Sequence, residues 1–153
     1  MRPPFTTEYA EDAEEHMEWN EITRDIISAA MKVHSKLGPG LLESAYEVCL
    51  AYELGKMGYT VKRQVELPIV YDGICLDAGY RMDLLVDDCV VVELKAAEAM
   101  LPVYEAQLLS YLKLSGKELG LLINFKVAHL RDGIKRFVNH SDSSVPSVVK
   151  RFF

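Results

Sequence analysis

The segment Tyr80-Arg81-Met82-Asp83-Leu84-Leu85-Val86, followed after a short turn by Val90-Val91-Val92-Glu93-Leu94-Lys95, decides the fold of this chain. Both segments are largely aliphatic, which predicts two neighbouring strands in the middle of a sheet. Three charged side chains, Asp83, Glu93 and Lys95, nevertheless interrupt them. Because burying an unpaired charge is costly, strands that accept three charges normally pair them or use them.

The length of the turn between these strands decides whether the two carboxylates meet. Glu93 and Lys95 are two positions apart, so they point to the same face of their strand. A three-residue loop, residues 87–89, would place Asp83 directly opposite Glu93. A two-residue loop would instead pair Asp83 with Val92 and separate the two acids across the sheet, unless a bulge intervened. A functional site in this hairpin therefore requires a particular register.

Two adjacent carboxylates with a lysine suit a divalent cation, because Mg²⁺ and Mn²⁺ prefer hard oxygen ligands. Such an ion neutralises charge on a transferring phosphate and lowers the pKa of an attacking water. The same three side chains also fit a structural network of ion pairs on a solvated sheet face. Their spacing alone favours neither interpretation.

The rest of the chain predicts one α/β domain around this hairpin. Asn20 is a candidate N-cap for a helix that ends at Gly38-Pro39-Gly40, and Asp72-Gly73 is a strong hairpin signal. The predicted order is α-α-β-β-β-α-β, with a mixed sheet. The elements are helices over about 20–37, 42–57 and 102–114, strands over about 61–71, 74–86, 89–94 and 119–125, and an edge strand within 127–138.

Composition is typical of a soluble protein with one domain. The chain has 153 residues, 50% hydrophobic and 26% charged, and its three cysteines are not in CxxC spacing. No apolar run approaches the roughly 18 residues of a membrane span, and the acidic N-terminus lacks a signal pattern. A cytoplasmic protein without membrane contact is therefore expected. We expect a mobile acidic arm over 1–19, one domain over 20–139 and a tail over 140–153.

The charge distribution does not settle the partner. A net charge of −6 by itself argues against nucleic acid. Residues 1–20 contain one basic and six acidic side chains, whereas residues 101–153 contain eight basic and four acidic ones. A cluster of functional carboxylates would also make the middle of the chain acidic.

The motifs and their order resemble the PD-(D/E)XK nuclease superfamily. Asp83 followed by Glu93-x-Lys95, after one helix and before another, looks like the core motif of that superfamily. The segment Gly40-Leu41-Leu42-Glu43-Ser44-Ala45-Tyr46 matches GxxExxY, the motif after which one bacterial and archaeal family of the superfamily is named. The resemblance covers about residues 20–139. It implies a restriction-endonuclease-like fold, with a mixed sheet flanked by helices, and metal-dependent cleavage of nucleic acid.

The resemblance also implies roles for individual residues. By position, Asp83 and Glu93 would be metal ligands and Lys95 the catalytic lysine. Glu43 would be the helix carboxylate that reaches the metal directly or through water. Met82 stands where the superfamily pattern has proline, at a position that varies widely.

The predicted third helix adds Gln107-Leu108-Leu109-Ser110-Tyr111, which is similar to the QxxxY element of RecB-type nucleases. There, glutamine and tyrosine flank the metal site and meet the DNA, and the spacing places Gln107 and Tyr111 on one helix face. For Arg81, a phosphate contact and an ion pair to Glu43 both stay open. Tyr46 either bonds an active-site group or packs, and packing is favoured. Glu47 and Glu53 are typical of an exposed helix face.

We therefore expect a nuclease that hydrolyses phosphodiester bonds of DNA with Mg²⁺ or Mn²⁺. The alternative is a module of the same fold that binds nucleic acid or protein without cleavage, although no charged motif residue is missing, which disfavours it. A third hypothesis is a subunit that docks through its N-terminal arm or its Val145…Phe152-Phe153 tail. A homodimer is also open, because small nucleases of this class often pair their sites.

Overall fold

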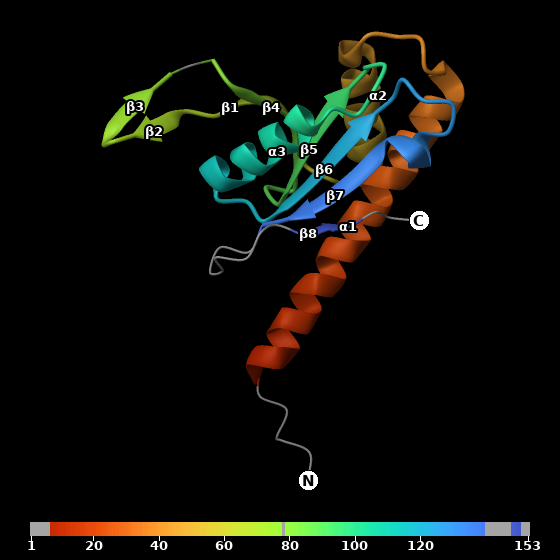
Figure 1. Ribbon diagram of the computed structural model, residues 1–153. Coiled ribbons are helices and arrows are strands. Elements are labelled where there is room, and N and C mark those ends of the chain that lie inside the picture. Colours follow the sequence, from red (N-terminus) through yellow and green to blue (C-terminus); the bar gives the residue numbers. More distant parts are fainter. Residues whose placement is uncertain (1–6, 78, 140–147, 151–153) are drawn as a thin grey trace.

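The structure is a computed structural model that describes residues 7–77, 79–139 and 148–150, with side chains between residues 14 and 139 except at position 78. It confirms the predicted α/β class (Figure 1). The helices are α1 (Thr7–Leu37), α2 (Glu43–Lys56), α3 (Pro102–Ser115) and the short 3₁₀ helix η1 (Leu130–Gly133). The strands are β1 (Val61–Glu66), β2 (Ile69–Tyr71), β3 (Ile74–Leu76), β4 (Arg81–Val86), β5 (Val90–Lys95), β6 (Leu119–Asn124), β7 (Ile134–Val138) and β8 (Val148–Lys150).

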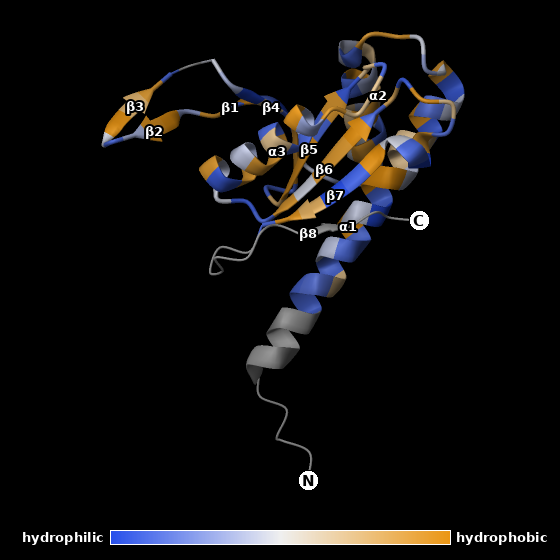
Figure 2. Cartoon of the chain, in the orientation of Figure 1, coloured by the Kyte–Doolittle hydropathy of each residue, from blue (hydrophilic) through white to orange (hydrophobic). Residues whose placement is uncertain are grey.

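The main sheet is mixed and has helices on both faces. Its six strands lie in the order β1-β4-β5-β6-β7-β8, and β5 and β6 are parallel while the other neighbours are antiparallel. The crossover between the two parallel strands contains α3. Residues of α1 and α2 share one core cluster with one sheet face, and α3 shares a second cluster with the other face. The central strands β5 and β6 are predominantly hydrophobic (Figure 2), because helices cover both of their faces.

The turn between β4 and β5 has the length that the site requires. Val86 pairs with Val90, which leaves a loop of three residues, and the same register continues to Leu84 opposite Val92. Asp87 and Asp88 have φ angles of 49° and 52°, a conformation that aspartate tolerates better than most residues. Of the two loop lengths that the sequence left open, the structure has the three-residue loop.

The two long strands predicted before β5 are each divided. Pro68 separates β1 from β2, since proline cannot donate a hydrogen bond to a ladder. Gly79 lies in the connection between β3 and β4 with a φ of 74°, and this connection divides the second predicted strand. The Asp72-Gly73 hairpin is confirmed, but β2 and β3 form a separate two-stranded sheet that extends from the main body (Figure 1).

The first helix begins earlier than predicted. It starts at Thr7, so Asn20 lies inside α1 and the N-cap assignment was wrong. The reason is Trp19, which is only 8% exposed and continues the buried face of Ile22 and Ile26 towards the N-terminus. The division of the chain into arm, domain and tail stays a prediction. No helix of the described part is long and apolar enough to cross a membrane.

The chain beyond residue 139 contributes one described strand. β8 pairs antiparallel with β7, so β7 is not the edge strand that was predicted. The rest of the expected tail, including Val145 and the terminal Phe152-Phe153 pair, lies outside the described residues.

Tyr46 fixes the turn that precedes α2. Its ring is fully buried and stacks on Phe125 with centroids 4.3 Å apart. Its hydroxyl donates to the Gly38 carbonyl oxygen at 2.5 Å and accepts from the Leu41 N–H at 3.0 Å. The favoured packing interpretation therefore agrees with the structure, and the hydroxyl in addition holds the loop directly before Glu43.

We expect Tyr46→Phe to lower the free energy of unfolding by about 1–2 kcal/mol, because the ring stays packed while both loop hydrogen bonds are lost. Urea denaturation measures this change. Tyr52→Phe is the matched control, since Tyr52 lies on the same helix and is 65% exposed. Equal stabilities for the two variants would contradict this role of the hydroxyl.

Candidate active site

The side chains of β4 cease to alternate regularly between the two faces of the sheet at Asp83. β1 and β4 pair in one continuous register from Val61–Val86 to Glu66–Arg81. Within this register, Gln64 and Asp83 stand opposite each other but are not paired. Leu84 packs in the core cluster under α1 and α2, whereas Met82, two positions away, packs in the cluster under α3. A regular strand would place both on one face. Asp83 therefore lies where the strand changes face.

Asp83 and β5 exchange hydrogen bonds across the hairpin. The Asp83 N–H donates to Glu93 Oε1 at 3.0 Å, and the Leu94 N–H donates to Asp83 Oδ2 at 2.9 Å. Two side-chain carboxylates thus take the place of backbone acceptors beyond the Leu84–Val92 pair. The predicted meeting of Asp83 and Glu93 follows from this arrangement.

Glu93 is a buried acid beside a second acid. Its side chain lies in β5 and the residue is only 3% exposed. Burial raises the pKa of Glu93 to about 8, and the adjacent charge of Asp83 adds to the rise. The two carboxyl groups also lie within hydrogen-bonding reach, which favours a proton on Glu93. The hydrogen bond from the Asp83 N–H and the charge of Lys95 lower the pKa of Glu93, but by less than burial and Asp83 raise it.

Helix α3 supports Lys95. The Lys95 Nζ donates to Gln107 Oε1 at 2.9 Å and lies 4.7 Å from the centroid of the Tyr104 ring. The Gln107 Nε2 in turn donates to the Tyr111 hydroxyl at 3.1 Å. Burial raises the pKa of Tyr111, and the charge of Glu93 contributes. The structure therefore brings Gln107 and Tyr111 together with the lysine of the hairpin.

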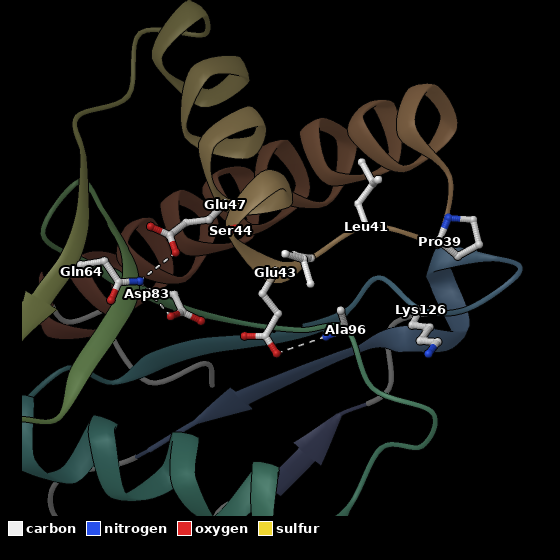
Figure 3. A pocket seen from close by; sticks show the side chains of 11 residues that line it. Pro39, Leu41, Glu43, Ser44, Glu47, Gln64, Asp83, Ala96 and Lys126 are labelled. Carbon is white, nitrogen blue, oxygen red and sulfur yellow. Dashed lines mark hydrogen bonds between the residues drawn. The ribbon is translucent and has the colours of Figure 1, made fainter.

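Glu43 approaches from the opposite side, at the start of α2. Its Oε1 accepts a hydrogen bond of 3.4 Å from the N–H of Ala96, the residue after Lys95. Glu43 and Asp83 line one cavity of about 760 Å³ (Figure 3). Gln107 and Tyr111 instead line a second cavity of about 440 Å³. The candidate residues thus converge on the hairpin from two sides and do not share one cavity.

Arg81 lies at the exposed start of β4. Its Nη2 contacts Glu66 Oε1 at 3.5 Å. Of the two interpretations left open, an ion pair to Glu43 is absent from the described residues, and a phosphate contact stays a prediction.

Glu47, Arg63 and Gln64 form a second part of the site that the sequence analysis missed. Glu47 is 6% exposed, so its assignment to an exposed face was wrong. Its Oε1 accepts from Arg63 Nε at 3.1 Å and its Oε2 from Gln64 Nε2 at 2.7 Å. The spacing of four residues from Glu43 places both acids on one face of α2, which was the available signal. Glu53 is instead paired with Lys32 at 2.9 Å.

The hairpin carboxylates fit a divalent cation. Asp83 and Glu93 are adjacent hard-oxygen donors whose mutual repulsion is relieved by a proton, and a cation would relieve it more fully. Among the described residues no three His, Cys, Asp or Glu side chains are grouped to hold a metal. Glu43 therefore does not complete such a group, and water would fill the other positions, as is usual for Mg²⁺.

The sequence model of the PD-(D/E)XK nuclease superfamily matches residues 20–137. The chain belongs to the PD-(D/E)XK nuclease superfamily. The resemblance inferred from the motifs is confirmed at this level, and the mixed sheet flanked by helices is consistent with a restriction-endonuclease-like fold. Proteins of this superfamily are typically nucleases and generally use divalent metals, so membership suggests a nuclease that acts on nucleic acid. No curated protein and no solved structure matches the chain.

We expect the metal-free protein to lose stability as the pH rises. The folded pKa of Glu93, about 8, exceeds its ordinary value of 4.5. The folded state therefore binds an extra proton between these values, and the stabilisation present below pH 4.5 is lost as the pH passes 8. In a chelating buffer, Glu93→Gln should become more stable than wild type by on the order of a few kcal/mol at pH 9 and differ little at pH 5.

Urea denaturation at both pH values measures this difference. Glu66→Gln is the control, because Glu66 is an exposed carboxylate of the same sheet, and its pH dependence should follow wild type. A constant difference between Glu93→Gln and wild type at all pH values would contradict the buried proton.

Proposed function

We propose that this protein is a nuclease that hydrolyses phosphodiester bonds of DNA with Mg²⁺ or Mn²⁺, and that it belongs to the GxxExxY family of its superfamily. The observation that carries the proposal is the meeting of Asp83 and Glu93 across the hairpin, with Lys95 on the face of Glu93. The family assignment is supported by Tyr46, which fixes the turn from which Glu43 enters the cavity.

Asp83 and Glu93 would hold the cation, and Glu43 would act on it through water. When bound, the cation neutralises charge on the phosphate and lowers the pKa of an attacking water. Because the two acids are fixed by backbone N–H groups, they need little rearrangement to accept it.

Lys95 would hold a phosphate oxygen, and it would orient the attacking water or deprotonate it as a general base. Its ammonium is fixed by the Gln107 carbonyl oxygen and the Tyr104 ring, so its position does not depend on the substrate. The Tyr111 hydroxyl orients the Gln107 amide, which turns the oxygen towards Lys95. We propose that Gln107, Tyr111 and the exposed Arg81 contact nucleic acid around this site.

We expect Asp83→Asn to abolish cleavage and Lys95→Ala to lower kcat by roughly 10²–10⁴-fold, the range expected if Lys95 acts as general base. Lys95→Ala should retain Mn²⁺ binding by calorimetry, because both carboxylates remain. Plasmid and single-stranded DNA, each incubated with Mg²⁺, Mn²⁺ or a chelator, provide the assay. Lys113→Ala, on the exposed face of α3, is the matched lysine control and should cleave like wild type.

Cleavage by Asp83→Asn, or a wild-type kcat in Lys95→Ala, would contradict these roles. DNA binding that falls with salt and needs no divalent metal, without cleavage, would instead favour the binding module.

A further inference from the structure

We propose that Gln64 is a positioning residue for the nuclease reaction, which fixes the carboxylate of Asp83 for the cation by linking it to a buried anchor, Glu47. This inference rests on the proposed function and adds a residue of β1 that none of the motifs contains.

The backbone of Gln64 is strained at the position where the sheet is interrupted. Its φ is 51°, in the left-handed region that residues with a side chain rarely adopt. It lies opposite Asp83, at the one position that the register between β1 and β4 skips. Val61 packs against the core under α1 and α2, whereas Val65 packs against the core under α3. Strand β1 therefore changes face at Gln64, as β4 does at Asp83.

The side chain of Gln64 uses this conformation to join two carboxylates. Its Nε2 donates to Glu47 Oε2 on α2 at 2.7 Å and to Asp83 Oδ1 on β4 at 3.2 Å. A side-chain amide nitrogen carries two hydrogens, so it can make both bonds at once. Figure 3 shows the amide between the two acids at the wall of the cavity. Strain of this kind persists only where surrounding contacts enforce it.

Glu47 is suited to be the anchor of this link. It is 6% exposed, and Arg63 Nε holds its other oxygen at 3.1 Å. A buried carboxylate must have hydrogen-bonding partners, and two successive residues of β1 provide them here. Glu47 is therefore held from both sides and gives Gln64 a fixed point on α2.

The consequence for Asp83 is that both carboxylate oxygens are fixed. Oδ1 accepts from Gln64 and Oδ2 accepts from the Leu94 N–H. Hydrogen bonds to a metal-ligating carboxylate set its orientation and raise its affinity for the ion. Without the Gln64 amide, Asp83 would keep one of its two bonds and could rotate about its Cβ–Cγ bond.

A purely structural role predicts a different result. Gln64 would then only tie α2 to β1, and its removal would lower stability without changing metal affinity. Gln64→Gly distinguishes the two roles, because glycine adopts a positive φ freely. This variant loses both hydrogen bonds, and relief of the backbone strain offsets part of the stability lost when Glu47 Oε2 loses its partner.

The test is calorimetric titration of Mn²⁺ into wild type, Gln64→Gly and Asp72→Gly without DNA. Asp72 has a φ of 49° in the turn of the separate β2–β3 sheet, so Asp72→Gly relieves similar strain away from the site. We expect Gln64→Gly to weaken Mn²⁺ binding roughly 10- to 100-fold and Asp72→Gly to bind like wild type. Plasmid cleavage by Gln64→Gly should need more Mg²⁺, with an unchanged KM for DNA.

Each outcome separates the two proposals. Wild-type Mn²⁺ affinity in Gln64→Gly overturns the positioning role and leaves the proposed function standing. Absence of both Mn²⁺ binding and cleavage in wild type overturns the proposed function and the positioning role with it. If circular dichroism shows that Gln64→Gly does not fold, Gln64→Met, which keeps the side-chain length but has no donor, is judged by the same affinities.

Discussion

The site depends on the exchange of hydrogen bonds between Asp83 and β5. Backbone pairing between β4 and β5 stops after Leu84 and Val92, which leaves N–H groups that need acceptors inside the sheet. The Glu93 and Asp83 carboxylates supply them. This exchange explains how two acids are accommodated in otherwise apolar strands. It also brings the two carboxylates close enough to repel each other.

The repulsion between the Asp83 and Glu93 carboxylates is only partly offset by the surrounding protein groups. Glu93 is buried and lies beside Asp83, so a proton occupies the pair at neutral pH. Lys95 is on the same face, yet its ammonium is directed to Gln107 and the Tyr104 ring. Buried, coupled carboxyl groups of this kind occur preferentially at functional sites. The pair is thus better satisfied by a divalent cation than by the groups around it.

The parts of the site that could be predicted are those set by local spacing. The interval of four residues placed Gln107 and Tyr111 on one helix face. For Asp83 and Glu93 the sequence left two loop lengths open, and the structure has the three-residue loop that lets them meet. The positive φ of Gln64 has no local signal, because glutamine has no preference for it. The burial of Glu47 depends on partners from β1, which are distant in sequence. Asn20 was misread because a polar residue within a long helix resembles a cap.

The change of face in β1 and β4 explains why residues from both sides of the sheet can act together. Glu43 comes from the helix layer of α1 and α2, whereas Gln107 comes from α3 on the other face. A regular sheet would lie between these two helix layers and would direct their side chains to opposite faces. At Asp83 the side chains of β4 change from one face of the sheet to the other. At the end of β5, the Ala96 N–H bonds to Glu43 and the Lys95 side chain bonds to Gln107, so adjacent residues contact both helix layers. A regular hairpin of this register would also place Asp83, Glu93 and Lys95 on one face. The irregularity at Gln64 and Asp83 matters because Asp83 in addition lines the cavity of Glu43 and Gln64.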